Sequence, residues 1–207
     1  FHRRDFILIN KPQLTYRKLR GYLYKFHFTR LRLFQPARTC LKYIRHPKLI
    51  RKLQLLQLDD ASWKRIKFTR FFNLSSLKIR SGSRISAFKN PIGHFLKQLT
   101  LYRNLRSFSL RTREFDLANK HAHNYRPLRN LTSLSITIEK WVSTERSMML
   151  ANFIQSCPKL VSLRTTIFVN GNALLYALST LSRTKTFPNL KHFRFVSGDI
   201  TGEGIAC

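Results

Sequence analysis

Apolar residues recur along the chain in one short pattern: an apolar residue, two variable residues, a second apolar residue, one variable residue and a third apolar residue. Five copies occupy residues 74–79, 105–110, 131–136, 160–165 and 190–195, and their first residues lie 31, 26, 29 and 30 positions apart. Two apolar residues separated by one lie on the same face of a β-strand. Each copy therefore predicts a short strand with one buried face.

Two further copies are expected earlier in the chain, at residues 23–28 and 53–58, and the second of these could instead be read from Leu49. With them, residues 21–207 hold about six to seven repeats. Residues 1–20 fit no repeat, and we expect them to form a basic N-terminal arm or a cap. A chain of 207 residues is long enough for one domain with a sizeable core.

The stretches between the strands carry apolar residues near helical spacing. They predict helices over residues 36–45, 91–101, 143–156 and 172–182. Each unit of strand and helix has an apolar side that it cannot bury alone, whereas stacked units bury a continuous core. The pattern therefore predicts an α/β repeat protein with a parallel sheet.

Short turn-like segments precede three of the strands: His46-Pro47-Lys48-Leu49, Cys157-Pro158-Lys159-Leu160 and Phe187-Pro188-Asn189-Leu190. Together with the apolar pattern, they make residues 20–205 resemble leucine-rich repeat (LRR) proteins of the ribonuclease-inhibitor and F-box-associated types. The resemblance implies a short, irregular solenoid with a curved parallel sheet on its concave side and helices on its convex side.

The chain departs from the LRR pattern after the strands. The asparagine that usually follows each strand is replaced by Gly82, Arg113, Glu139, Phe168 and Gly198. A generic α/β domain with chance matches to the repeat is the alternative interpretation.

The chain is strongly basic. There are 39 lysines and arginines against 9 acidic residues, a formal net charge of +30. The excess falls along the chain, from +16 over residues 1–70 to +10 over residues 71–140 and +4 thereafter. A compact body with this charge repels itself strongly. We therefore expect a permanent polyanionic partner that meets mainly the N-terminal two thirds.

If the leucines face inward, the residues between them form three columns on the concave face. The first holds Ser76, Ser107, Ser133, Ser162 and His192, the second Lys78, Ser109, Ser135, Arg164 and Arg194, and the third Arg80, Arg111, Thr137, Thr166 and Val196. Hydroxyl groups and guanidinium groups both suit phosphate oxygens. Small polar residues also tolerate crowding on a curved sheet, which is the simpler explanation of the serines.

A second set of candidate phosphate ligands is defined by the N-terminal excess of charge. It comprises Arg3, Arg4, Arg17, Lys18, Arg20, Lys25, Arg30, Arg32, Arg38, Lys42, Arg45, Lys48, Arg51 and Lys52. Tyr16, Tyr22, Tyr24 and Tyr43 lie between these cations and could stack on unpaired bases. Packing within the protein is the alternative for these tyrosines.

Other chemistry finds little support in the sequence. No nucleotide-binding or nucleophile motif is present, and His121 and His123 lack further metal ligands at suitable spacing. Asp59 and Asp60 fit a helix cap. The three cysteines make no disulfide framework, and the sequons at Asn73 and Asn130 fit chance matches. We expect no enzyme activity, cofactor, metal, small-molecule substrate or transmembrane segment.

These observations favour a structural RNA-binding protein that is an accessory component of a ribosome, with ribosomal RNA and other ribosomal proteins as partners. The first residue is Phe1, which fits a trimmed precursor. We therefore expect a mitochondrial matrix location, with the cytoplasm or nucleolus as alternatives. The main rival is an LRR protein–protein adaptor, such as an F-box-type receptor or an assembly factor of a respiratory complex. A third hypothesis is a peripheral protein on an anionic membrane.

Overall fold

The computed structural model describes residues 4–8, 21, 24–25, 27–34, 40–58, 68–81, 99, 102–112, 128–139, 144–167, 171–182 and 188–198. They form eight strands: β1 (Arg4–Leu8), β2 (Phe28–Phe34), β3 (Lys52–Leu58), β4 (Ser76–Ser81), β5 (Ser107–Thr112), β6 (Ser133–Ile138), β7 (Ser162–Ile167) and β8 (His192–Ser197). The helices are α4 (Thr144–Gln155) and α5 (Gly171–Ser182), with short 3-10 helices η1 (Cys40–Tyr43), η2 (Pro47–Leu49) and η3 (Phe68–Phe71).

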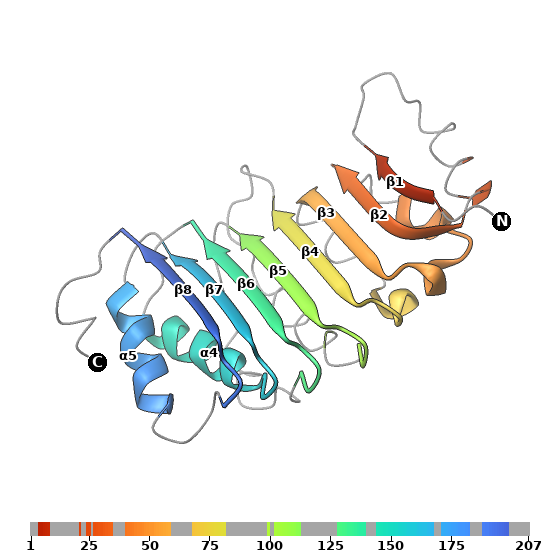
Figure 1. Ribbon diagram of the computed structural model, residues 1–207. Coiled ribbons are helices and arrows are strands. Elements are labelled where there is room, and N and C mark those ends of the chain that lie inside the picture. The colour runs from red at the N-terminus through yellow and green to blue at the C-terminus, as the bar shows by residue number, and fades with distance from the viewer. Residues whose placement is uncertain are drawn as a thin grey trace.

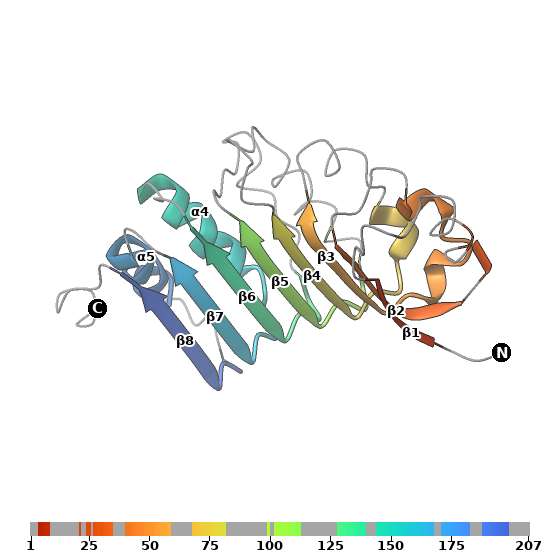
Figure 2. The ribbon, with the colours of Figure 1, turned by 90° about the horizontal axis from the view of Figure 1, so that it is seen from above.

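All eight strands belong to one sheet, and each pairs in parallel with the strand that follows it along the chain. Figure 1 shows this order as an unbroken run from β1 to β8. Parallel neighbours need a connection that returns along a face of the sheet. Figure 2 shows α4, α5 and the 3-10 helices on one side of the sheet, so within the described residues the opposite face is left open.

The same turn leads into five of the strands. The backbone N–H of the first apolar residue of each pattern donates to the carbonyl three residues earlier, as in Ile50 to Pro47, Leu74 to Phe71 and Leu160 to Cys157, at 3.1–3.2 Å. The equivalent bonds of Leu105 and Leu131 measure 3.2 and 3.0 Å. The repetition seen in the sequence is therefore a structural repeat.

The core lies between the sheet and the helices. On β6, Leu134, Ile136 and Ile138 are buried while the residues between them are partly exposed, which is the alternation that a half-covered sheet requires. Helix α4 contributes Leu150, Phe153 and Ile154 to the same cluster. Burying each such side chain stabilises the fold by roughly 1.5–3 kcal/mol.

The copies at residues 74–79, 105–110, 131–136, 160–165 and 190–195 each give a strand, β4 to β8, that begins two residues after the copy does. The inward face is buried in the first four, whereas in β8 Phe193 is 51% exposed. Helices 143–156 and 172–182 are confirmed as α4 and α5. The two earlier copies were placed in the wrong register. The pattern of β2 begins at Phe28 and not at Leu23, and that of β3 begins at Ile50 and not at Leu53 or Leu49. Leu56 caused the second error, because it lies on the face of β3 opposite Leu53 and Leu55.

The helix predicted over residues 36–45 is also wrong within the described residues, where a 3-10 helix occupies Cys40–Tyr43. The first apolar residues of β2, β3 and β4 are only 22 and 24 positions apart, which leaves too little chain for a helix as long as α4. The helix predicted over residues 91–101 lies almost wholly outside the described residues. Residues 4–8 of the N-terminal segment extend the sheet as its edge strand.

Candidate nucleic-acid interface

The open face of the sheet carries the three columns of side chains that the sequence predicts. Pairing between strands aligns Ser76, Ser107, Ser133, Ser162 and His192 in one row across the sheet. Neighbouring strands lie about 4.8 Å apart, so the serine hydroxyls follow one another at that spacing. The register also extends the columns onto β3 and β2, where Lys52 and Arg30 continue the first and Gln54 and Arg32 the second.

Positive charges meet directly on this face. Strand pairing places Arg30 beside Lys52, Arg80 beside Arg111, and Arg164 beside Arg194, and all six side chains are exposed. Two like charges about 4.8 Å apart repel each other by about 1 kcal/mol in water. An anion that lies between two such cations removes this repulsion.

The register pairs Asp5 of β1 with Arg30, but the described side chains include few carboxylates. Among the side chains that the structure describes, eighteen are lysine or arginine and one, Glu139, is acidic. Its carboxylate accepts a bond of 2.7 Å from Nε of Arg111. Arg70 donates to the carbonyls of Leu41 and Ile44 and so stabilises the turn after η1. Arg70 and Arg111 are therefore engaged within the chain.

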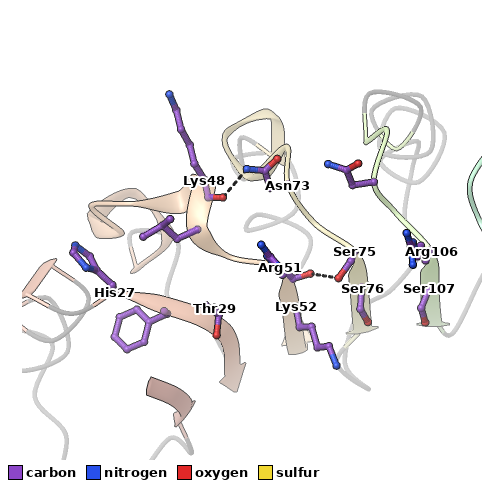
Figure 3. A pocket seen from close by; sticks show the side chains of 13 residues that line it. His27, Thr29, Lys48, Arg51, Lys52, Asn73, Ser75, Ser76, Arg106 and Ser107 are labelled. Atoms are coloured by element: carbon purple, nitrogen blue, oxygen red, sulfur yellow. Dashed lines mark hydrogen bonds between the residues drawn. The ribbon is translucent and has the colours of Figure 1, made fainter. Parts of the chain in front are cut away.

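A groove runs along the N-terminal ends of β2 to β5, at the edge of the open face (Figure 3). It encloses about 920 Å³. Its charged and polar lining is His27, Thr29, Lys48, Arg51, Lys52, Asn73, Ser75, Ser76, Asn104, Arg106 and Ser107, with Phe28 and Leu49 as apolar members. Lys52, Ser76 and Ser107 point the same way from three neighbouring strands (Figure 3). No carboxylate is among the described residues of this lining.

Hydrogen bonds between successive repeats fix the floor of the groove. The carbonyl of Arg51 accepts from the backbone N–H groups of Ser75 and Ser76 at 2.8 and 3.0 Å, and from the hydroxyl of Ser75 at 3.1 Å. The carbonyl of Arg106 accepts in the same way from Thr132 and Ser133. Because these backbone groups are held by the sheet, Arg51 and Arg106 project from fixed points.

Asparagines form a second row of bonds, one turn earlier. The amide nitrogen of Asn73 donates to the carbonyl of Lys48 at 3.0 Å, that of Asn130 to Arg103 at 2.7 Å, and that of Asn189 to Pro158 at 3.4 Å. Sequence reasoning missed this ladder, although its signal is present: asparagine precedes the first leucine of four repeats. The two sequon asparagines, Asn73 and Asn130, both belong to it.

Aromatic rings and cations are associated near the N-terminal end of the groove. The guanidinium of Arg45 lies 5.2 Å from the ring centre of Tyr24, and Nζ of Lys48 lies 5.6 Å from that of Phe72. Tyr24 is 56% exposed and Phe72 44% exposed. Tyr43 instead packs against the core, which is the alternative that the sequence left open for it.

Two histidines contact each other in the same part of the chain. The rings of His27 and His46 meet edge to face with centres 4.4 Å apart. Partial desolvation, followed by the nearby His27 and Arg45, lowers the pKa of His46 below its ordinary value of 6.5. His46 therefore stays neutral at neutral pH, and its ring nitrogens include an acceptor.

The remaining candidates divide by position. The exposed candidates are Lys25, Arg30, Arg32, Arg45, Lys48, Arg51, Lys52, Lys78, Arg80, Arg164 and Arg194, together with Arg111, which is paired with Glu139. The side chains of Arg3, Arg4, Arg17, Lys18, Arg20, Arg38 and Lys42 lie outside the described part of the structure, together with Tyr16, Tyr22, Asp59, Asp60, His121 and His123. Sequence reasoning did not single out Arg106, although it lines the groove.

No helix in the described part of the chain is long and apolar enough to cross a membrane. The same residues contain no group of three or more His, Cys, Asp or Glu side chains that could hold a metal ion. Cys157 is buried, and burial raises the pKa of its thiol to about 12. Neither a protein-family model nor a curated protein matches the chain, so its resemblance to leucine-rich repeats stays a prediction from the sequence.

Proposed function

We propose that the protein is a structural RNA-binding component of a ribosome, held to ribosomal RNA by phosphate contacts from its open face. The observation that carries this proposal is the placing of like charges side by side across neighbouring strands, as at Arg164 and Arg194, among described side chains that include a single carboxylate. Such an arrangement is destabilising unless anions lie against it. RNA supplies a continuous row of phosphates, and binding of this kind weakens steeply with salt.

We also propose that the fold is an irregular leucine-rich repeat solenoid whose open face is the concave one. The turn before each strand, the aligned apolar columns and the repeated carbonyl rows all favour this assignment. LRR proteins present this face to their partners. Here its serines and arginines suit phosphate oxygens.

A protein neighbour is the second candidate contact, and one observation favours it. Phe193 on β8 is 51% exposed although it occupies an inward column, and its ring centre lies 6.2 Å from that of the partly buried Phe195 on the same face. Exposed apolar side chains that lie together are typical of protein contacts. We propose that this C-terminal end meets another ribosomal protein, or the partner of an adaptor if the RNA assignment is wrong.

Sedimentation tests the proposal. The protein, expressed in a cell that contains its natural particles, should co-sediment with ribosomes at moderate salt and leave that fraction after nuclease digestion. A mitochondrial fraction is the first place to look, with the cytoplasm and nucleolus as alternatives. A partner that stays bound after nuclease digestion supports the hypothesis of a protein–protein adaptor. Flotation with anionic vesicles, in place of sedimentation with ribosomes, supports the hypothesis of a peripheral membrane protein.

A further inference from the structure

We propose that the groove over the N-terminal ends of β2 to β5 binds a short single-stranded segment of RNA, with an unpaired base against Phe72. This inference rests on the proposed RNA binding and assigns a specific binding site to it. It concerns which form of RNA enters one part of the surface, whereas the open face accounts for attraction to RNA of any form.

The size of the groove favours a single strand. A volume of about 920 Å³ is that of a pocket for a small ligand and not that of a surface for a double helix. An RNA duplex offers its phosphates and 2′-hydroxyls on the outside of a wide cylinder, and it can contact only the rim of such a hollow. A single strand can place its backbone inside and leave a base free to stack beside the groove.

The polar lining fits the sugar–phosphate backbone. Arg51, Lys52 and Arg106 bring three exposed cations to one hollow, and cations of this kind neutralise phosphates. The hydroxyls of Ser76 and Ser107 point the same way as Lys52 (Figure 3). A hydroxyl both donates and accepts, as the ribose 2′-hydroxyl does, so the two groups can pair with each other in either direction.

Two apolar side chains, one in the lining of the groove and one next to it, are exposed and have no use in phosphate binding. Leu49 lines the groove and is 45% exposed, and Phe72, next to the lining residue Asn73, is 44% exposed. Lys48 joins them, because it lines the groove and its ammonium lies 5.6 Å from the Phe72 ring centre. A base stacked on Phe72 would carry its phosphate toward the charge of Lys48. Stacking of bases on aromatic side chains is the common means of holding single strands.

Fluorescence anisotropy with a labelled single-stranded 12-mer and the matching duplex tests the inference. Phe72→Ala should weaken binding of the single strand roughly 5- to 150-fold, since stacking of one base is worth about 1–3 kcal/mol. It should change binding of the duplex less than about 2-fold. Phe72→Trp, with a larger ring, should strengthen binding of the single strand. Phe193→Ala is the matched control, since Phe193 is a similarly exposed ring at the other end of the sheet.

The outcomes separate the two proposals. Two results would overturn the proposed single-strand site and leave RNA binding intact. One is that Phe72→Ala weakens binding of the single strand and of the duplex equally, and the other is that Phe72→Ala and Phe72→Trp both bind as the unaltered protein does. Absence of binding to either nucleic acid by the unaltered protein would overturn RNA binding itself. Thermal unfolding of each variant shows whether it folds, and Phe72→Trp gives a second readout if Phe72→Ala does not.

Discussion

Removing three charges from the open face should weaken RNA binding by an amount that follows from electrostatics alone. The perturbation is the combined variant Arg32→Gln, Lys78→Gln and Arg80→Gln, whose three side chains are exposed on β2 and β4. Glutamine keeps most of the length and the polarity of each side chain. The variant therefore removes charge without opening the core.

The magnitude is set by counterion release. Each phosphate contact contributes about −0.7 to the slope of log K against log salt for a single strand and about −0.9 for a duplex. Loss of three contacts should make the slope shallower by roughly 2 to 3, and at 0.15 M salt it should weaken binding roughly 50- to 170-fold. Titrations at four or more salt concentrations measure both quantities.

A control with the same loss of charge decides whether position matters. Arg129→Gln, Lys159→Gln and Lys191→Gln removes three exposed cations from the turns before β6, β7 and β8. This control should retain most of the original slope. If both variants lose binding equally, general net charge explains the attraction, and the assignment of the interface to the open face is refuted.

Three further predictions concern the free protein. Added sodium chloride should raise its thermal midpoint, because salt screens the repulsion between neighbours such as Arg164 and Arg194; a midpoint that falls would contradict the account. Asn130→Ala should lower the free energy of unfolding in guanidinium chloride by about 1 kcal/mol, since Asn130 donates to Arg103 and accepts from Lys159. Asn104→Ala, at the equivalent position, should cost less, and equal losses would argue against the ladder. Cys157 should resist alkylation at pH 8 until the protein unfolds, because a thiol with a pKa of about 12 is almost fully protonated there; rapid labelling of Cys157 in the folded protein would contradict its burial.

The spacing of apolar residues along the chain was sufficient to predict strands β4 to β8 and helices α4 and α5. In β4 to β6 the apolar residues alternate strictly with polar ones, so only one register buries them, and the columns that start at Ser76 follow from it. In β3 the run Leu53, Leu55, Leu56 and Leu58 offers apolar residues to both faces. Two registers then bury similar area, and the sequence does not distinguish them.

The sequence predicts which charged residues the interface contains, but not the contacts between residues of different repeats. Which cations are exposed on the open face follows from the register, as for Lys78 and Arg164. The ion pair of Arg111 with Glu139 joins residues of neighbouring strands and depends on a long-range contact. The groove depends on how four successive turns align, and this alignment has no signature within any one repeat.

Protection of individual lysines shows whether RNA lies on the open face of the sheet. Amine acetylation of the protein, read by mass spectrometry with and without a saturating RNA, compares the exposed Lys52 and Lys78 of the basic strands with the exposed Lys159 and Lys191 of the C-terminal turns. If RNA binds the open face, it should slow the modification of Lys52 and Lys78 and leave the rates at Lys159 and Lys191 nearly unchanged. Equal rates at all four lysines with RNA bound, or protection confined to Lys159 and Lys191, would contradict it.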